Sequence, residues 1–120
     1  MDGELSFFEL GVADVKRGRA FYEGLFGWTF DSGPSDQGFA IRTPTLAGGM
    51  HGGDAGASPY VFFRVADIDA AVERVRTLGG TVEDTDVEGN AESIERFGRF
   101  KLCRDDQGSS FGLHQPPKAG

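Results

Sequence analysis

Three side chains in this sequence have types suited to chemistry: Glu9, which interrupts an apolar run, and His51 and His114, the only histidines of the chain. Two histidines and one carboxylate are the ligand set of many iron sites. A carboxylate that faces a ligand could instead act as a general base with a raised pKa, or bind a cation. The structural alternative makes Glu9 a surface charge at a strand end and places both histidines near solvent, after their strands.

An internal repeat relates the two histidines. The sequence Val12–Asp14 recurs as Val65–Asp67, 53 positions later, and an aromatic-rich apolar run precedes each copy. The segment Ala47–His51 aligns with Ser110–His114, so the histidines occupy equivalent positions. A repeat of this size is a complete supersecondary unit, and two short units of this kind are expected to share one core.

Each copy predicts the same order of elements. Asp14 and Asp67 stand where helix N-caps are expected, and Gly27 and Gly80 stand where the helices should end. Short apolar runs rich in strand-forming residues predict the strands. The expected strands are 5–12, 27–31, 37–43, 46–51, 59–65, 81–87, 97–104 and 108–114, and the expected helices are 15–26 and 68–78.

This order predicts an α+β fold built from two tandem βαβββ modules. The modules are expected at about residues 5–53 and 58–116, within a single domain of residues 1–120. Because consecutive elements are usually adjacent, each module should form its own small sheet. We expect the two sheets to join edge to edge as a cupped mixed sheet, with the helices on its outer face.

Four segments carry a resemblance to a known family. They are Phe8–Asp14 and Arg19–Trp28 in the first half, and Phe63–Ala71 and Arg104–Leu113 in the second. They resemble the vicinal oxygen chelate superfamily, which contains glyoxalase I, bleomycin-resistance proteins and extradiol dioxygenases. The resemblance covers nearly the whole chain and implies the fold, which hosts many activities. One departure is Asp106, where the family's last hairpin usually has proline.

The resemblance also implies four metal-holding positions, one in the first strand and one in the last strand of each module. In this sequence they hold Phe7, Gly49, Tyr60 and Gly112. Three of these residues have no donor side chain, and tyrosine is a poor ligand unless it is ionised. We therefore expect no metal and no cofactor there, and a cup with aromatic walls and free space at its floor.

A displaced metal site remains open as an alternative. Residues i and i+2 of a strand share a face, so Glu9 lies on the face of Phe7, and each histidine lies on the face of a glycine of the set. Glu9, His51 and His114 could then hold a metal next to the positions that the resemblance implies.

Further residues are candidate ligand contacts. Phe7, Tyr60 and Phe62 share a strand face and could stack on a planar ligand, or simply pack in the core. Arg42 and Arg99 lie in predicted strands, where an inward guanidinium would hold an anionic ligand and an outward one would face solvent.

Composition argues against several classes of function. The net charge is −7 and no long basic run occurs, which argues against a nucleic-acid partner. No apolar run approaches the roughly 18 residues of a membrane span, and no signal peptide is visible. The single cysteine, Cys103, excludes an intrachain disulfide and suits a reducing cytoplasm.

The sequence therefore predicts a small cytoplasmic protein, a homodimer, that binds a cationic or aromatic small molecule without a metal. The resemblance to bleomycin-resistance proteins implies sequestration of the ligand without chemistry. The alternative is a glyoxalase-like lyase, isomerase or dioxygenase that uses the displaced metal site, or Glu9 as its acid–base residue. The candidate ligand-binding residues are Phe7, Glu9, Arg42, Gly49, His51, Tyr60, Phe62, Arg99, Gly112 and His114.

Overall fold

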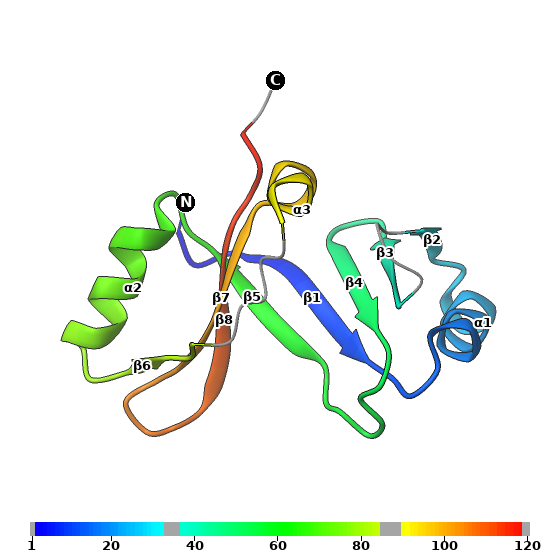
Figure 1. The fold of residues 1–120 in the computed structure, drawn as a ribbon, viewed down its shortest axis with the longest axis horizontal. Helices are drawn as coiled ribbons and strands as arrows, with labels where there is room; N and C mark the ends of the chain where they lie inside the picture. The colour runs from blue at the N-terminus through cyan, green and yellow to red at the C-terminus, as the bar shows by residue number, and fades with distance from the viewer. Residues whose placement is uncertain (1, 33–36, 85–89, 119–120) are drawn as a thin grey trace. The chain divides into compact units, whose positions relative to one another are not determined.

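A computed structural model describes residues 2–32, 37–84 and 90–118 of the chain (Figure 1). The chain divides into two compact units. One unit is Phe7–Tyr60, and the other combines Met1–Ser6 with Val61–Gly120. We describe each unit by itself and call them the Phe7–Tyr60 unit and the C-terminal unit.

The Phe7–Tyr60 unit is a mixed sheet with one helix. Its strands follow the order β2-β3-β4-β1; β1 and β4 are parallel, and the other neighbours are antiparallel. In the parallel pair, Glu9 lies opposite Gly49, and Gly11 lies opposite His51. The elements are β1 (Leu5–Gly11), α1 (Val15–Phe26), β2 (Thr29–Ser32), β3 (Gly38–Arg42) and β4 (Ala47–His51).

Alternation along the strands divides this sheet into two faces. The face toward α1 forms the core with that helix; the buried side chains are Leu10, Phe30, Ile41 and Met50 of the sheet and Val15 of α1. Residues one position away in each strand, including Glu9 and Gly49, point to the opposite face. The helix begins as predicted, because the Asp14 carboxylate accepts hydrogen bonds from the amides of Lys16 (2.9 Å) and Arg17 (3.2 Å).

The C-terminal unit repeats this plan with an additional helix. Its strands follow the order β5-β8-β7-β6, with β5 and β8 parallel. Asp67 caps α2 by accepting a hydrogen bond from the Ala70 amide at 3.1 Å. The core contains Val65, Ile68, Val72, Cys103 and Leu113. The elements are β5 (Tyr60–Arg64), α2 (Ile68–Thr77), β6 (Thr81–Val82), α3 (Ala91–Phe97), β7 (Arg99–Arg104) and β8 (Ser110–Gln115).

The N-terminal residues belong to the C-terminal unit, although the sequence groups them with the first module. The Gly3 amide donates to the Arg64 carbonyl at 2.8 Å, and the Arg64 amide donates to the Glu4 carbonyl at 2.7 Å. These backbone hydrogen bonds hold the start of the chain against β5. The predicted single domain of residues 1–120 stays a prediction.

The predicted α+β class, with two βαβββ modules and mixed strand pairing, is confirmed. The sequence did not predict α3, which Asn90 caps by accepting a hydrogen bond from the Ser93 amide at 3.0 Å. Because α3 extends to Phe97 and Gly98 follows it, β7 begins at Arg99 and not at 97. The predicted strand 81–87 is reduced to β6 at its start, and residues 85–89 lie outside the described part.

Among the described residues, no helix has the length and apolar character needed to cross a bilayer.

Candidate functional site

A hydrogen-bonded row of three side chains lies in the Phe7–Tyr60 unit. The ring of His51, at the end of β4, is held between two carboxylates. Its Nδ1 lies 2.6 Å from Oε2 of Glu9, and its Nε2 lies 2.8 Å from Oδ2 of Asp54. Glu9 and His51 share a face because the register of β1 and β4 brings them to neighbouring positions. The structure thus brings together two of the predicted site residues and adds Asp54.

The space for this row comes from two glycines. A Cβ at Gly49 would collide with Oε1 of Glu9, and a Cβ at Gly11 would lie 2.9 Å from Nε2 of His51 and against the Asp54 carboxylate. Any side chain at these two positions would displace the row. The carboxylate of Glu9 therefore occupies the volume into which the last-strand ligand of the superfamily would project.

The charges of the row depend on one another. Burial raises the pKa of Glu9, and its hydrogen bond and ionic contact with His51 offset only part of this. Burial by itself would lower the pKa of His51, but the hydrogen bonds and charges of Glu9 and Asp54 outweigh it and raise the pKa. Both ring nitrogens face carboxylate oxygens, which accept hydrogen bonds, and this geometry favours the imidazolium form, in which both nitrogens donate. The row then has a net charge of about −1.

In the C-terminal unit, an aromatic ring fills the volume that corresponds to that of the Glu9 carboxylate. Gly112 lies opposite Phe62 in the parallel pair of β5 and β8, just as Gly49 lies opposite Glu9. A Cβ at Gly112 would collide with the Phe62 ring, which also packs edge-on against Phe100 at 5.1 Å between centroids. Phe62 is therefore core packing at the position where Glu9 is a polar group.

His114 has a structural environment unlike that of His51. It is 5% exposed, and its ring stacks on Phe100 at 4.4 Å. Its Nε2 lies 2.8 Å from the Phe97 carbonyl, which only accepts, so this nitrogen donates and Nδ1 accepts from the Ser6 hydroxyl at 2.9 Å. Burial lowers the pKa of His114, which keeps the ring neutral.

The donors present do not fit the metal that the superfamily implies. Phe7, Gly49 and Gly112 offer no donor side chain. His114, a member of the displaced alternative, makes hydrogen bonds within its own unit with both ring nitrogens. No group of three or more His, Cys, Asp or Glu side chains in the described part of the chain is arranged to hold a metal ion. The chemistry of the row is therefore derived without a metal.

The remaining predicted residues lie in three environments. Phe7 is buried, and its ring tip lies 3.5 Å from the Cβ position of Gly49, so it adjoins the row. Tyr60 is half-buried at the start of β5. Arg42 is exposed at the end of β3 and pairs with Asp31 of β2 through two contacts of 2.9 and 3.2 Å.

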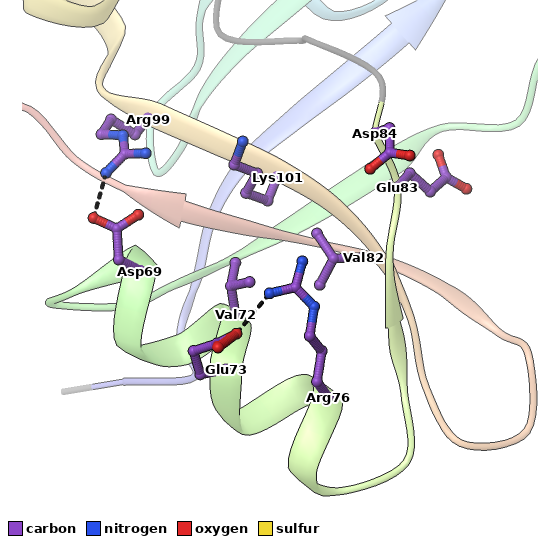
Figure 2. A pocket seen from close by; sticks show the side chains of 9 residues that line it. All are labelled: Asp69, Val72, Glu73, Arg76, Val82, Glu83, Asp84, Arg99 and Lys101. Atoms are coloured by element: carbon purple, nitrogen blue, oxygen red, sulfur yellow. Dashed lines mark hydrogen bonds and ion pairs between the residues drawn. The ribbon is translucent and has the colours of Figure 1, made fainter.

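Arg99 lies on the helix-facing side of its sheet, away from Gly112. It lines a groove of about 430 Å³ together with residues of α2 and β6. Figure 2 shows the side chains that line this groove. There its guanidinium pairs with Asp69 at 3.0 Å, and Arg76 of the same groove pairs with Glu73 at 2.6 Å. Arg99 thus contributes to a charged surface groove of the C-terminal unit, on the face of the sheet opposite Phe62 and Gly112.

Asp54 is the residue that the sequence analysis missed. It reaches His51 because the chain turns back after β4: the Gly53 amide donates to the Ala13 carbonyl at 3.2 Å, and the Asp54 amide donates to the Val12 carbonyl at 3.0 Å. The available signal was an acidic residue three positions after a histidine, across two glycines. Only the turn geometry shows that this carboxylate reaches the far ring nitrogen.

Comparisons with known proteins agree with this architecture. A family model described as bleomycin resistance protein-like N-terminal matches residues 5–42. An anthracycline biosynthesis protein, DauV of Streptomyces sp. (strain C5), is 30% identical over 132 aligned residues, which cover 92% of this chain and 46% of that protein. A protein called putative glyoxylase CFP32 in Mycobacterium bovis is 27% identical, with 94% and 46% covered.

Among solved structures, methylmalonyl-CoA epimerase from Mycobacterium tuberculosis superposes with a TM-score of 0.65 at 19% identity, covering 96% of this chain and 89% of the epimerase. These matches, together with the resemblance in the sequence, indicate the vicinal oxygen chelate superfamily. The chain spans about half the length of the two relatives named above. The four positions that the resemblance assigns to a metal hold Phe7, Gly49, Tyr60 and Gly112 in this chain.

The two histidines should titrate in opposite directions. In an NMR pH titration, we expect the midpoint of His51 above about 6.5 and that of His114 below it. His51→Gln assigns the signals. Asp54→Asn should lower the His51 midpoint, whereas the control Asp31→Asn should leave it unchanged. A His51 midpoint below that of His114 would contradict the imidazolium assignment.

The raised pKa of His51 also makes the stability of the fold depend on pH. The pKa of His51 is higher in the folded state than its unfolded value of about 6.5. Protonation of His51 therefore stabilises the fold fully at pH values below about 6.5. This stabilisation is lost as the pH rises through the pKa of the folded state. The difference in unfolding free energy between the wild type and His51→Gln should therefore decrease over that interval, as measured by urea denaturation at each pH.

Proposed function

We propose that this protein binds a small organic molecule at the row Glu9–His51–Asp54, as a binding protein of the glyoxalase and bleomycin-resistance type, without a metal. Its membership of the superfamily supports a small-molecule-binding function at the family level. The names of its relatives, which refer to bleomycin resistance and anthracycline biosynthesis, support a ligand of the natural-product kind.

The single observation that carries the proposal is the position of the Glu9 carboxylate. One oxygen is held by His51, and the other lies over Gly49. In the described part of the chain, His51 is the one residue that hydrogen-bonds this carboxylate. The Glu9 side chain is 27% exposed, which supports access of a ligand to this carboxylate. An N–H or O–H donor of the ligand would complete its hydrogen bonding.

Charge and shape define the ligand class. A row with a net charge of about −1 favours a cationic donor such as an ammonium or amidinium group. The Phe7 ring beside Gly49 favours an aromatic or apolar part of the ligand next to that donor. We therefore propose an aromatic amine. The net charge of −7 supports the absence of a nucleic-acid partner, and the single cysteine, buried with a pKa of about 11, is consistent with a cytoplasmic location.

Binding should depend on the charge of Glu9. In a calorimetric screen of aromatic amines and their neutral isosteres, we expect the amines to bind more tightly. Glu9→Gln should weaken amine binding about 10- to 100-fold, because it removes a charge-assisted hydrogen bond worth about 1.5–3 kcal/mol. The matched control Glu73→Gln changes an exposed carboxylate on α2 and should leave binding unaltered. Equal affinities for Glu9→Gln and the wild type would exclude Glu9 as the ligand contact.

Metal content tests the metal-independent part of the proposal. Protein purified without chelator should contain far less than one transition-metal ion per chain by elemental analysis. Addition of Zn²⁺, Mn²⁺ or Fe²⁺ should leave amine affinity unchanged. A stoichiometric metal that disappears in His51→Ala would show that a displaced metal site exists.

A second candidate function is proton transfer by Glu9, as in a glyoxalase-like lyase or isomerase. It is favoured by the raised pKa of Glu9 and its 2.6 Å contact with His51, which together provide a base and an acid in contact. Exchange of a bound ligand's carbon-bound hydrogen for deuterium, followed by NMR in D2O, tests it. Exchange that is lost in Glu9→Gln would support an enzyme, and binding without exchange would support a binding protein.

A further inference from the structure

The outward face of α1 differs from that of its counterpart in the repeat. Opposite the core, α1 presents Ala20, Phe21 and Gly24, all exposed. The 53-residue repeat places Glu73, Arg74 and Thr77 of α2 at the equivalent positions. Phe21, whose counterpart is Arg74, is 63% exposed; Leu25, one turn further along, is 58% exposed, and its counterpart Leu78 is exposed as well. Scattered apolar residues on a surface need no explanation, but a group on one helix face points to an interaction site.

Glycine at position 24 is not required by the packing of α1 itself. A Cβ built there would meet no described atom within 4 Å apart from its chain neighbours and the backbone of its own helix. Glycine is a poor residue in the middle of a helix, so another residue would favour the isolated helix. A small residue on an exposed helix face does allow a second helix to approach closely.

Apart from the Asp14 cap, the charged side chains at the two ends of α1 do not complement its dipole. Within α1, which the structure describes throughout, the first turn has no acidic residue and the last turn has no basic residue; Lys16 and Arg17 lie near the positive N-terminal end. The other two helices have the favourable arrangement, with an acidic residue in the first turn and basic residues in the last. Cations at a helix N terminus become favourable when the C terminus of another helix lies beside them.

We propose that α1 is a dimerisation surface on which a second copy of this chain packs its own α1, antiparallel, around a twofold axis. An axis that passes between residues 22 and 23 brings Phe21 of one copy opposite Gly24 of the other, and Ala20 opposite Leu25. Each large side chain then meets a small one. The same patch serves both copies, as a closed twofold interface requires.

This arrangement also accounts for the basic residues. The axis brings Arg17 to the C-terminal end of the partner's α1, where the last carbonyls of the helix accept hydrogen bonds. A hollow of about 350 Å³ lies at that end and is lined in part by Phe26 and Trp28. Their rings offer faces on which a guanidinium can stack. The charges that are unfavourable in one copy become favourable across the interface.

The test is the mass in solution, measured by sedimentation equilibrium over a range of concentrations. The wild type should have twice the mass of the chain. Phe21→Arg and Gly24→Thr, which copy the residues of α2, should each raise the dimer dissociation constant at least tenfold. The matched control Leu78→Arg changes a side chain at the end of α2 that is 70% exposed, and it should have no effect.

Arg17→Glu distinguishes the interface from an effect on the fold. This change improves the charge pattern of α1 within one copy, so the melting temperature of the monomer should not decrease. The dimer should nevertheless weaken, because the partner's helix C terminus would face a carboxylate. A monomeric wild type, or a dimer that all three α1 variants leave unchanged, would overturn the proposal. If Phe21→Arg fails to fold, Gly24→Thr and Arg17→Glu still decide it.

Discussion

The parallel pairing of β1 with β4 is the constraint on which the candidate site depends. This register sets Glu9 opposite Gly49 and Gly11 opposite His51, so each polar side chain lies beside a residue that has no side chain. A carboxylate and an imidazole can then lie flat against the strands and reach each other at 2.6 Å. A shift by one residue would send both groups to the core side, where α1 packs on Leu10 and Met50.

The repeat shows how one backbone plan supports two different interiors. In both units a glycine in the last strand lies opposite a residue of the first strand, and that residue fills the glycine's empty volume. In one unit the filler is the carboxylate of Glu9, and in the other it is the ring of Phe62. The histidines diverge in the same way: His51 is charged between two carboxylates, whereas His114 is neutral, stacked on a ring and bound to a carbonyl. Equivalent positions in the two units therefore share their backbone geometry but differ in the chemistry of their side chains.

Much of this could be predicted from sequence because strand parity and helix caps are local properties. Asp14 and Asp67 mark the helix starts, and the two-residue period correctly puts Glu9 on the side of Gly49. The contribution of Asp54 could not be predicted, because it depends on a turn that brings a loop back to the end of β1. The buried, hydrogen-bonded environment of His114 could not be predicted either. It depends on Ser6 and on α3, which lie far from it in the sequence or were not expected.

Under the proposed function, a protonated histidine takes the place of the superfamily's metal, and the site then selects hydrogen-bond donors and not acceptors. A divalent metal is an acceptor of lone pairs, so it selects ligands that present oxygen atoms with available electrons. In this chain the positive charge beside Glu9 belongs to His51, and both of its N–H groups are used by Glu9 and Asp54. What the row still offers is the second oxygen of Glu9, which accepts hydrogen bonds. Under this proposal, the backbone that would hold a metal for a chelating ligand presents an acceptor, which suits a ligand that carries hydrogen-bond donors.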